Sequence, residues 1–192
     1  MRKNKKSRCA WVTDDPIYIR YHDYEWGIPI YDDQLLFEFL ILEGAQAGLN
    51  WLTILKRREN YRLAFDNFDA EKIARYDEKK FQSLLLDARI IRNKLKIKST
   101  IQNAKSYLEI KNEFGNFSDY LWKFVDNNPI KNKWKNHAEI PTITEISDAL
   151  SKDLKKRGFS FVGSTICYAF MQATGMVNDH LTNCFCYDKI KK

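Results

Sequence analysis

Two histidines and two cysteines at opposite ends of the chain have the residue types and spacing of a metal site. His180 and Cys184 are four residues apart, which puts both side chains on one face of a helical turn. Cys9 and His22 lie near the N-terminus. Because structural Zn²⁺ takes four thiolate or imidazole ligands, these residues predict one zinc ion that joins the two termini.

The other candidate ligands fit a metal site less well. Cys167 lies in an apolar run typical of a buried core residue, and His137 lies in a polar stretch typical of an exposed loop. Cys186 adjoins the C-terminal pair as a further thiol. On spacing alone a second interpretation stays open, in which these residues bind no metal. Most cysteines and histidines in proteins are isolated buried cysteines or hydrogen-bonded histidines.

A single carboxylate follows a long apolar run. Seven of the eight residues at 35–42 are apolar, and Glu43 comes next on the helical face of Leu36 and Leu40. A buried carboxylate is costly unless it neutralises or finds a partner. Glu43 therefore either reaches water or an arginine at a helix end, or lines a pocket that accepts a cation or a hydrogen-bond donor.

Aromatic residues crowd the same regions of the sequence. Trp51 follows Glu43 by eight positions. Four more fall within nine positions next to His22: Tyr18, Tyr21, Tyr24 and Trp26. Most aromatic side chains belong to the core, but a group of them around a carboxylate can also form a box for a flat base. Stacking on one ring contributes roughly 1–3 kcal/mol per base, and a cationic base gains more.

The composition suits a folded domain with a polyanionic partner. The chain has 192 residues, 44% of them hydrophobic, and a formal net charge of +7. The charge favours polyanions as partners, although a basic surface can also serve only solubility. The basic N-terminus lacks the apolar stretch of a secretory signal, and no window reaches the roughly 18 apolar residues of a membrane span. We therefore expect a cytoplasmic protein, in which a disulfide is disfavoured.

The elements that would position these residues are helices. Helical periodicity recurs along the chain, with Asp32 or Asp33 as the cap before the apolar run and Gly115 as the stop after a long helix over 93–114. Strand signals are weak. We predict an all-α protein in which residues 127–143, which contain two prolines, form a long loop.

Four sequence blocks together resemble the bacterial 3-methyladenine DNA glycosylase I family, from Cys9 to Tyr187. They are "CAWVTDDPIYIRYHDYEWG", "LEGAQAGLNWLTILKRRENYRLAF", "LSKDLKKRGFSFVGSTICYAFMQATGMVNDH" and "HLTNCFCY". The resemblance implies a helix-hairpin-helix glycosylase fold. It also implies an enzyme that flips 3-methyladenine out of alkylated double-stranded DNA, hydrolyses its N-glycosidic bond, releases the base and leaves an abasic site.

The resemblance also implies the organisation of the chain. A single glycosylase domain of two helical lobes would span residues 9–187, between a basic tail at 1–8 and a C-terminal tail at 188–192. One structural Zn²⁺ would join the termini through the two thiols and two imidazoles named above. We expect a monomer in the bacterial cytoplasm, with no membrane partner.

The family's motifs imply which residues form the base pocket. The glutamate that recognises the methylated base falls on Glu43, and the stacking tryptophan falls on Trp51. The pocket tyrosine falls on Tyr21, with Tyr18 and Trp11 near the same pocket. No lysine nucleophile stands at the family's site, which implies a monofunctional enzyme that does not cleave the strand.

Other motifs imply contacts with DNA. Gln46, Gly48 and Leu49 match the segment that enters the base stack where the base has left. In the hairpin, "DARIIRNKLKIKS", Arg89 stands where a glycine is expected, and Leu95 replaces another small residue. Either this turn does not need the positive φ of glycine, or it holds the DNA phosphate in another way.

Five cations lie between positions 89 and 98 of this hairpin region. We expect Arg89, Arg92 and Lys94 to contact the DNA backbone, because an arginine fork suits a phosphate. The alternative is a solvated helix face.

Two other functions stay open from the sequence. A zinc-clipped helical module that binds DNA without chemistry accounts for the charge and the metal ligands, but not for Glu43 after an apolar run. A related glycosylase with a broader range of alkylated bases accounts for all of these features. The sequence does not determine the relative activity on 3-methyladenine and 3-methylguanine.

Overall fold

The computed structural model describes residues 7–189. The outer parts of both predicted tails, residues 1–6 and 190–192, lie outside the described residues. The prediction of an all-α protein is confirmed, apart from two strands of two residues each. None of the helices in the described part of the chain is both long and apolar enough to cross a bilayer.

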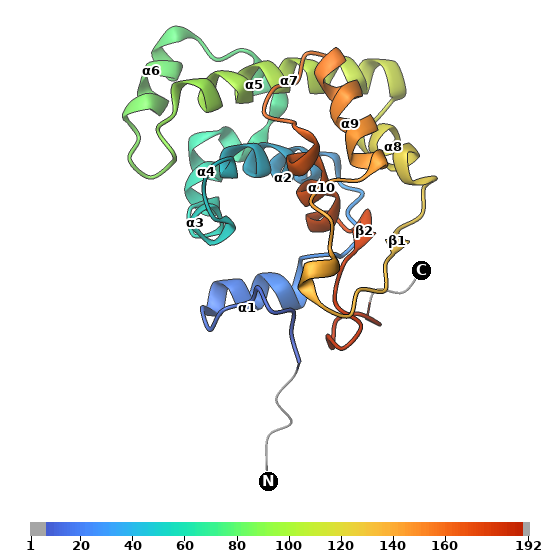
Figure 1. The fold of residues 1–192 in the computed structure, drawn as a ribbon. Helices are drawn as coiled ribbons and strands as arrows, with labels where there is room; N and C mark the ends of the chain where they lie inside the picture. Colours follow the sequence, from blue (N-terminus) through green and yellow to red (C-terminus); the bar gives the residue numbers. More distant parts are fainter. Residues whose placement is uncertain (1–6, 190–192) are drawn as a thin grey trace.

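Helix α2, Asp33–Gln46, is the centre of the fold because its sequence is apolar on every face. Its side chains from Leu36 to Leu42 are all buried, and it contacts α3, α7, α8 and α10. Figure 1 shows α7 passing on one side of α2 and α10, while α1 lies on the other side near the N-terminus.

The first half of the chain supplies α1 to α7. Their bounds are α1 Pro16–Tyr24, α2 as above, α3 Trp51–Leu55, α4 Arg58–Ala64, the 3-10 helix η1 Asp66–Phe68, α5 Ala70–Ala74, α6 Glu78–Leu86 and α7 Lys94–Phe114.

The second half contains the remaining helices and both strands. Their bounds are α8 Phe117–Trp122, η2 Lys123–Val125, β1 Ile130–Lys131, η3 His137–Glu139, α9 Glu145–Lys156, α10 Ser164–Ala173 and β2 Val177–Asn178. The two strands pair in parallel, with Ile130 opposite Val177. Residues 127–143, predicted as a loop throughout, therefore contain β1 and η3.

Local capping explains where the site-bearing helices begin and end. The Asp32 side chain accepts a hydrogen bond from the Leu35 N–H at the start of α2, as predicted. Asn93 caps α7 in the same way, and Gly115 ends that helix with a φ of 87°. The apolar run ends at Leu42, but the helix itself continues to Gln46. Glu43 therefore lies inside the last turn of α2.

Candidate active site and metal site

A cavity of about 280 Å³ lies where α1, α2, α3 and α10 meet the segment around η3. Most of its lining residues are aromatic or apolar, with a few polar groups. They are Trp11, Tyr18, Tyr21, Trp26, Glu43, Gln46, Trp51, His137, Ile140, Ala169 and Gln172. Small-ligand sites have this composition, and the volume is large enough for a single base.

Glu43 is the carboxylate of this cavity. Its side chain is buried, and no hydrogen-bond donor or cation among the described residues contacts it. Burial raises the pKa of Glu43 from 4.5 to about 8. Of the two interpretations of this residue, the structure supports the pocket, because Glu43 lines the cavity and meets no arginine.

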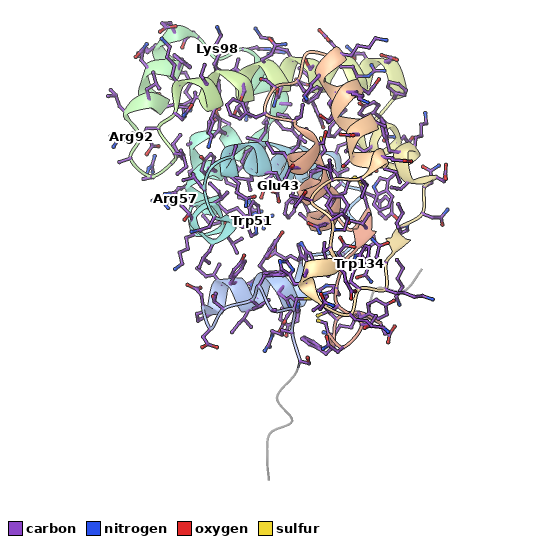
Figure 2. All side chains as sticks on the ribbon, in the orientation of Figure 1. Glu43, Trp51, Arg57, Arg92, Lys98 and Trp134 are labelled. Atoms are coloured by element: carbon purple, nitrogen blue, oxygen red, sulfur yellow. The ribbon has the colours of Figure 1, made fainter. Side chains whose placement is uncertain are left out.

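A second polar group in the cavity also lacks a partner. The indole Nε1 of Trp51 is buried and makes no hydrogen bond within the described part of the chain. Figure 2 shows Glu43 and Trp51 near the middle of the molecule, on the neighbouring helices α2 and α3. Because buried polar groups are almost always hydrogen-bonded, two unsatisfied groups in one cavity indicate a site that a ligand completes.

Aromatic contacts fix the walls of the cavity. The ring centroids of Tyr21 and Trp51 are 5.5 Å apart, and those of Trp11 and Tyr18 are 4.9 Å apart. Burial, together with the nearby Glu43 carboxyl, raises the pKa of both Tyr18 and Tyr21, so their hydroxyls stay protonated. Both tyrosines lie on α1, one helical turn apart.

The turn between α2 and α3 lies at the edge of this cavity. Gly48 has a φ of 77°, and a Cβ added there would meet nothing within 4 Å, so the glycine serves the backbone conformation. Leu49 is 40% exposed in this turn, next to Gln46, which lines the cavity. The Lys96 ammonium of α7 donates to the carbonyls of Ala45 at 2.8 Å and Ala47 at 2.6 Å. These are carbonyls at the end of α2, where a cation is favourable.

The hairpin between α6 and α7 does not need the glycine that was expected at Arg89. No residue from 87 to 95 has a positive φ, and Leu95 lies within α7, 66% exposed. Arg89 donates to both oxygens of Asp87, at 2.9 and 2.8 Å. Arg92 and Lys94 are exposed, and Figure 2 shows Arg92 on the loop before α7. Because Lys96 hydrogen-bonds the end of α2, it is not available to DNA, and at most four of the five cations at positions 89–98 are.

The four predicted metal ligands meet in one buried cluster. The donor atoms of Cys9, His22, His180 and Cys184 all lie within 4.8 Å of one another. The Cys184 Sγ is 3.4 Å from His22 Nε2 and 3.6 Å from His180 Nδ1, and the Cys9 Sγ is 3.6 Å from His180 Nδ1. A tetrahedral zinc ion with Zn–S of about 2.3 Å and Zn–N of about 2.1 Å separates sulfur from nitrogen by about 3.6 Å. The donor set therefore fits Zn²⁺.

Neighbouring groups orient these ligands. The other ring nitrogen of His22 is 2.8 Å from the Asp23 carboxylate, which Arg8 in turn holds with two hydrogen bonds. The remaining nitrogen of His180 donates to the Trp26 carbonyl at 3.1 Å. Such outer hydrogen bonds fix the tautomer that presents the free nitrogen to a metal.

The C-terminal part of the cluster is built from turns rather than from a helix. Residues 180–187 form turns after β2, yet His180 and Cys184 still face each other. Hydrogen bonds from Cys186, Cys9, His180 and His22 lower the pKa of the Cys184 thiol, which favours the thiolate form that binds metal. Cys167 is fully buried in α10 outside this cluster, as predicted.

The sequence of the whole chain matches known glycosylases. A profile described as methyladenine glycosylase matches residues 11–187. The chain belongs to the methyladenine glycosylase family. It is 53% identical to DNA-3-methyladenine glycosylase 1 of Escherichia coli K12 over 180 residues, which cover 94% of this chain and 96% of that protein. It is 50% identical to DNA-3-methyladenine glycosylase of Haemophilus influenzae, covering 94% and 97%.

Solved structures agree with this family membership. A crystal structure of a 3-methyladenine DNA glycosylase I matches with a TM-score of 0.92 at 52% identity, covering 94% of this chain and 99% of that one. Another, in complex with 3-methyladenine, has a TM-score of 0.92 at 36% identity, covering 96% and 99%. The prediction of an enzyme of the methyladenine glycosylase family, which the resemblance of the sequence blocks implied, is confirmed.

The structure brings most of the predicted pocket residues of this glycosylase together, and adds others. Tyr24, grouped with the pocket aromatics by position, is 66% exposed and does not line the cavity. His137 is exposed as predicted but lines the cavity, as does Ile140. Gln172 of α10 lines it as well. No spacing in the sequence relates these three residues to Glu43, because only tertiary packing joins them.

Proposed function

We propose that the chain hydrolyses the N-glycosidic bond of 3-methyladenine in alkylated double-stranded DNA. The main support for the proposal is Glu43, a buried carboxylate without a partner in an aromatic cavity that is large enough for a base. The similarity to proteins named DNA-3-methyladenine glycosylase supports the substrate, as does the similar structure that holds 3-methyladenine.

A base enters such a cavity only after it has left the duplex. Flipping a base costs a few kcal/mol of lost stacking and pairing. The turn that contains Gln46, Gly48 and Leu49 lies beside the cavity, so an exposed Leu49 can fill the space in the stack. Arg89, Arg92 and Lys94 then contact the DNA backbone at the neighbouring hairpin. In this proposal residues 9–187 act as one monomeric domain.

Charge selects the lesion. Methylation at N3 leaves the adenine of the nucleotide cationic. When this cation enters the cavity, Glu43 releases its proton to solvent, and the base becomes the partner that the carboxylate lacks. The faces of Trp51 and Tyr21 attract the same cation. Neutral adenine brings no charge to offset the burial of an ionised carboxylate, so it binds less well.

The reaction requires little further activation. The bond between N9 and C1′ breaks with its electron pair moving to the purine, which leaves as neutral 3-methyladenine. Water adds to C1′ and gives up a proton, which leaves an abasic site. No lysine is among the residues that line the cavity, so no amine forms a covalent adduct with the sugar, and the enzyme is monofunctional.

A zinc ion on Cys9, His22, His180 and Cys184 has a structural role in this proposal. Four protein ligands leave no open position for a substrate or a catalytic water. The ring of His180 packs 4.6 Å from Trp26, and that of His22 packs 5.2 Å from Trp11. Trp11 and Trp26 both line the cavity, so these histidines fix one of its walls.

The direct test is base release from methylated DNA, with the products separated and identified. We expect 3-methyladenine from the wild type, little from Glu43→Gln, and the wild-type amount from the control Glu59→Gln, which changes an exposed glutamate of α4. Binding of DNA without any released base would refute the proposal in favour of a non-enzymatic DNA-binding module. Comparable release of 3-methylguanine would indicate the broader glycosylase.

A further inference from the structure

The segment of residues 130–140, here called the wall segment, closes one side of the cavity. His137 and Ile140 line the cavity from this segment, whereas the other lining residues lie on or next to α1, α2, α3 and α10. The wall segment is irregular apart from β1 and the 3-10 turn η3. Its conformation therefore depends on the groups that anchor it, since a loop has no internal ladder to order it.

Asp179 is a side-chain anchor of the wall segment. Its side chain is fully buried, and it makes no ion pair within residues 7–189. One carboxylate oxygen accepts from Asn132 at 2.7 Å and from the Trp134 indole at 2.8 Å. The other accepts from Tyr168 at 2.6 Å and from Gln172 at 2.8 Å. One oxygen thus holds the wall segment and the other holds α10.

This arrangement fixes two sides of the cavity relative to each other. A buried carboxylate is stable only when neighbouring groups hydrogen-bond it fully, and hydrogen bonds to a charged acceptor are stronger than neutral ones. Gln172, one of the four donors, itself lines the cavity. Asp179 therefore connects a cavity residue of α10 directly to the segment that carries His137 and Ile140.

Backbone hydrogen bonds attach the first half of the wall segment and leave its second half at the cavity. The N–H groups of Ile130 and Asn132 donate to 176 and 178, and the carbonyl of Trp134 accepts from Thr182. Figure 2 shows Trp134 near the strands, where these contacts lie. Beyond Trp134, η3 hydrogen-bonds within itself, with the Ile140 N–H donating to the His137 carbonyl. The anchor at residues 130–134 therefore holds one side of η3, while Ile140 packs against the core.

We propose that the wall segment determines which alkylated bases the cavity accepts. Ile140 and His137 limit the size of the base, and Asp179 is the positioning residue that holds them in place. The inference rests on the proposed function, because it concerns the base that enters the same cavity. In a closely fitting apolar pocket, one added methylene changes the specificity ratio by about 10–200-fold.

The test compares release of 3-ethyladenine and 3-methyladenine from ethylated and methylated DNA. Ile140→Ala enlarges the cavity, and we expect the ratio of ethyl to methyl release to rise by about tenfold or more. His137→Ala should raise the same ratio by a smaller factor, and its exposed position keeps the fold intact. The matched control is Lys133→Ala, an exposed residue of the wall segment that does not line the cavity.

Trp134→Phe tests the anchor, because it removes one donor to Asp179 and keeps a ring of similar shape. We expect the ratio to rise by several-fold while release of 3-methyladenine persists. An unchanged ratio in both Ile140→Ala and His137→Ala would overturn the role of the wall segment. A changed ratio in those variants with an unchanged ratio in Trp134→Phe would overturn the role of Asp179. Failure of the proposed function is distinct, since the wild type would then release neither base.

Discussion

Glu43→Gln should make the protein more stable at neutral pH while it removes most of the activity. In the unfolded chain the Glu43 carboxyl ionises with its ordinary pKa of 4.5, whereas in the folded protein burial raises that pKa to about 8. Between these values the unfolded state binds fewer protons than the folded state, so the free energy of unfolding falls as the pH rises. Glutamine keeps the shape and does not titrate.

The size of the effect follows from the two pKa values. Each pH unit between them costs the wild type about 1.4 kcal/mol of stability. At pH 7 the accumulated loss is about 3 kcal/mol relative to pH 4.5, and it stops growing above a pH of about 8. The variant and the wild type should therefore have similar stability near pH 4.5, with the variant about 3 kcal/mol more stable at pH 7.

The assay is urea unfolding of both proteins at several pH values from 4.5 to 8.5, with base release measured on the same samples. Every other titrating group is common to the two proteins, so the difference between their free energies of unfolding isolates Glu43. A difference that stays constant with pH would refute the raised pKa and the electrostatic basis of recognition. A stable variant that still releases 3-methyladenine at the wild-type rate would refute the catalytic role alone.

Three further predictions concern the metal, the turn and the hairpin. Cys184→Ser should lose zinc by elemental analysis while the control Cys167→Ser retains it, and equal zinc in the wild type and Cys184→Ser would exclude the four-ligand site. Lys96→Met should lower the free energy of unfolding by about 1.5–3 kcal/mol, because it removes two charged hydrogen bonds to the end of α2. The exposed neighbour Lys98→Met should have little effect in the same denaturation experiment, and equal losses in both variants would contradict the role of Lys96. The double variant Arg89→Ala, Arg92→Ala should make the slope of log affinity against log salt shallower by about one unit for each lost phosphate contact. Arg75→Ala, on an exposed arginine after α5, is its control, and an unchanged slope in the double variant would mean that these cations face water.

Local sequence patterns predicted helix α2 and the unusual position of Glu43. The apolar run with its aspartate cap predicted α2, and the cost of burying a carboxylate predicted that Glu43 would neutralise or need a partner. The members of the Cys/His cluster were predictable because the chain has few cysteines and histidines, so elimination left one set of four. The spacing of His180 and Cys184 brought them together without a helix, because turns can join residues four apart as well as a helix can.

Two features of the hairpin region were beyond prediction. Lys96 counted as one of five hairpin cations, but its ammonium binds carbonyls about fifty positions earlier in the chain, at Ala45 and Ala47. The glycine expected at Arg89 proved unnecessary, because the backbone of this turn stays in conformations open to any residue. No periodicity or motif encodes either fact.

The cavity itself shows why a local pattern does not suffice. Its walls come from the region before α2, from α2 and α3, from the wall segment and from α10, so four distant parts of the chain must meet. The cluster of Cys9, His22, His180 and Cys184 brings the first and last of the described regions together. Asp179, next to His180, hydrogen-bonds both the wall segment and α10. His180, which helps to join the termini, and Asp179, which holds the wall segment, are therefore neighbours on the same short stretch of backbone. Disruption of the cluster by Cys184→Ser should therefore loosen the wall segment before it disturbs α2, which is buried in the apolar core.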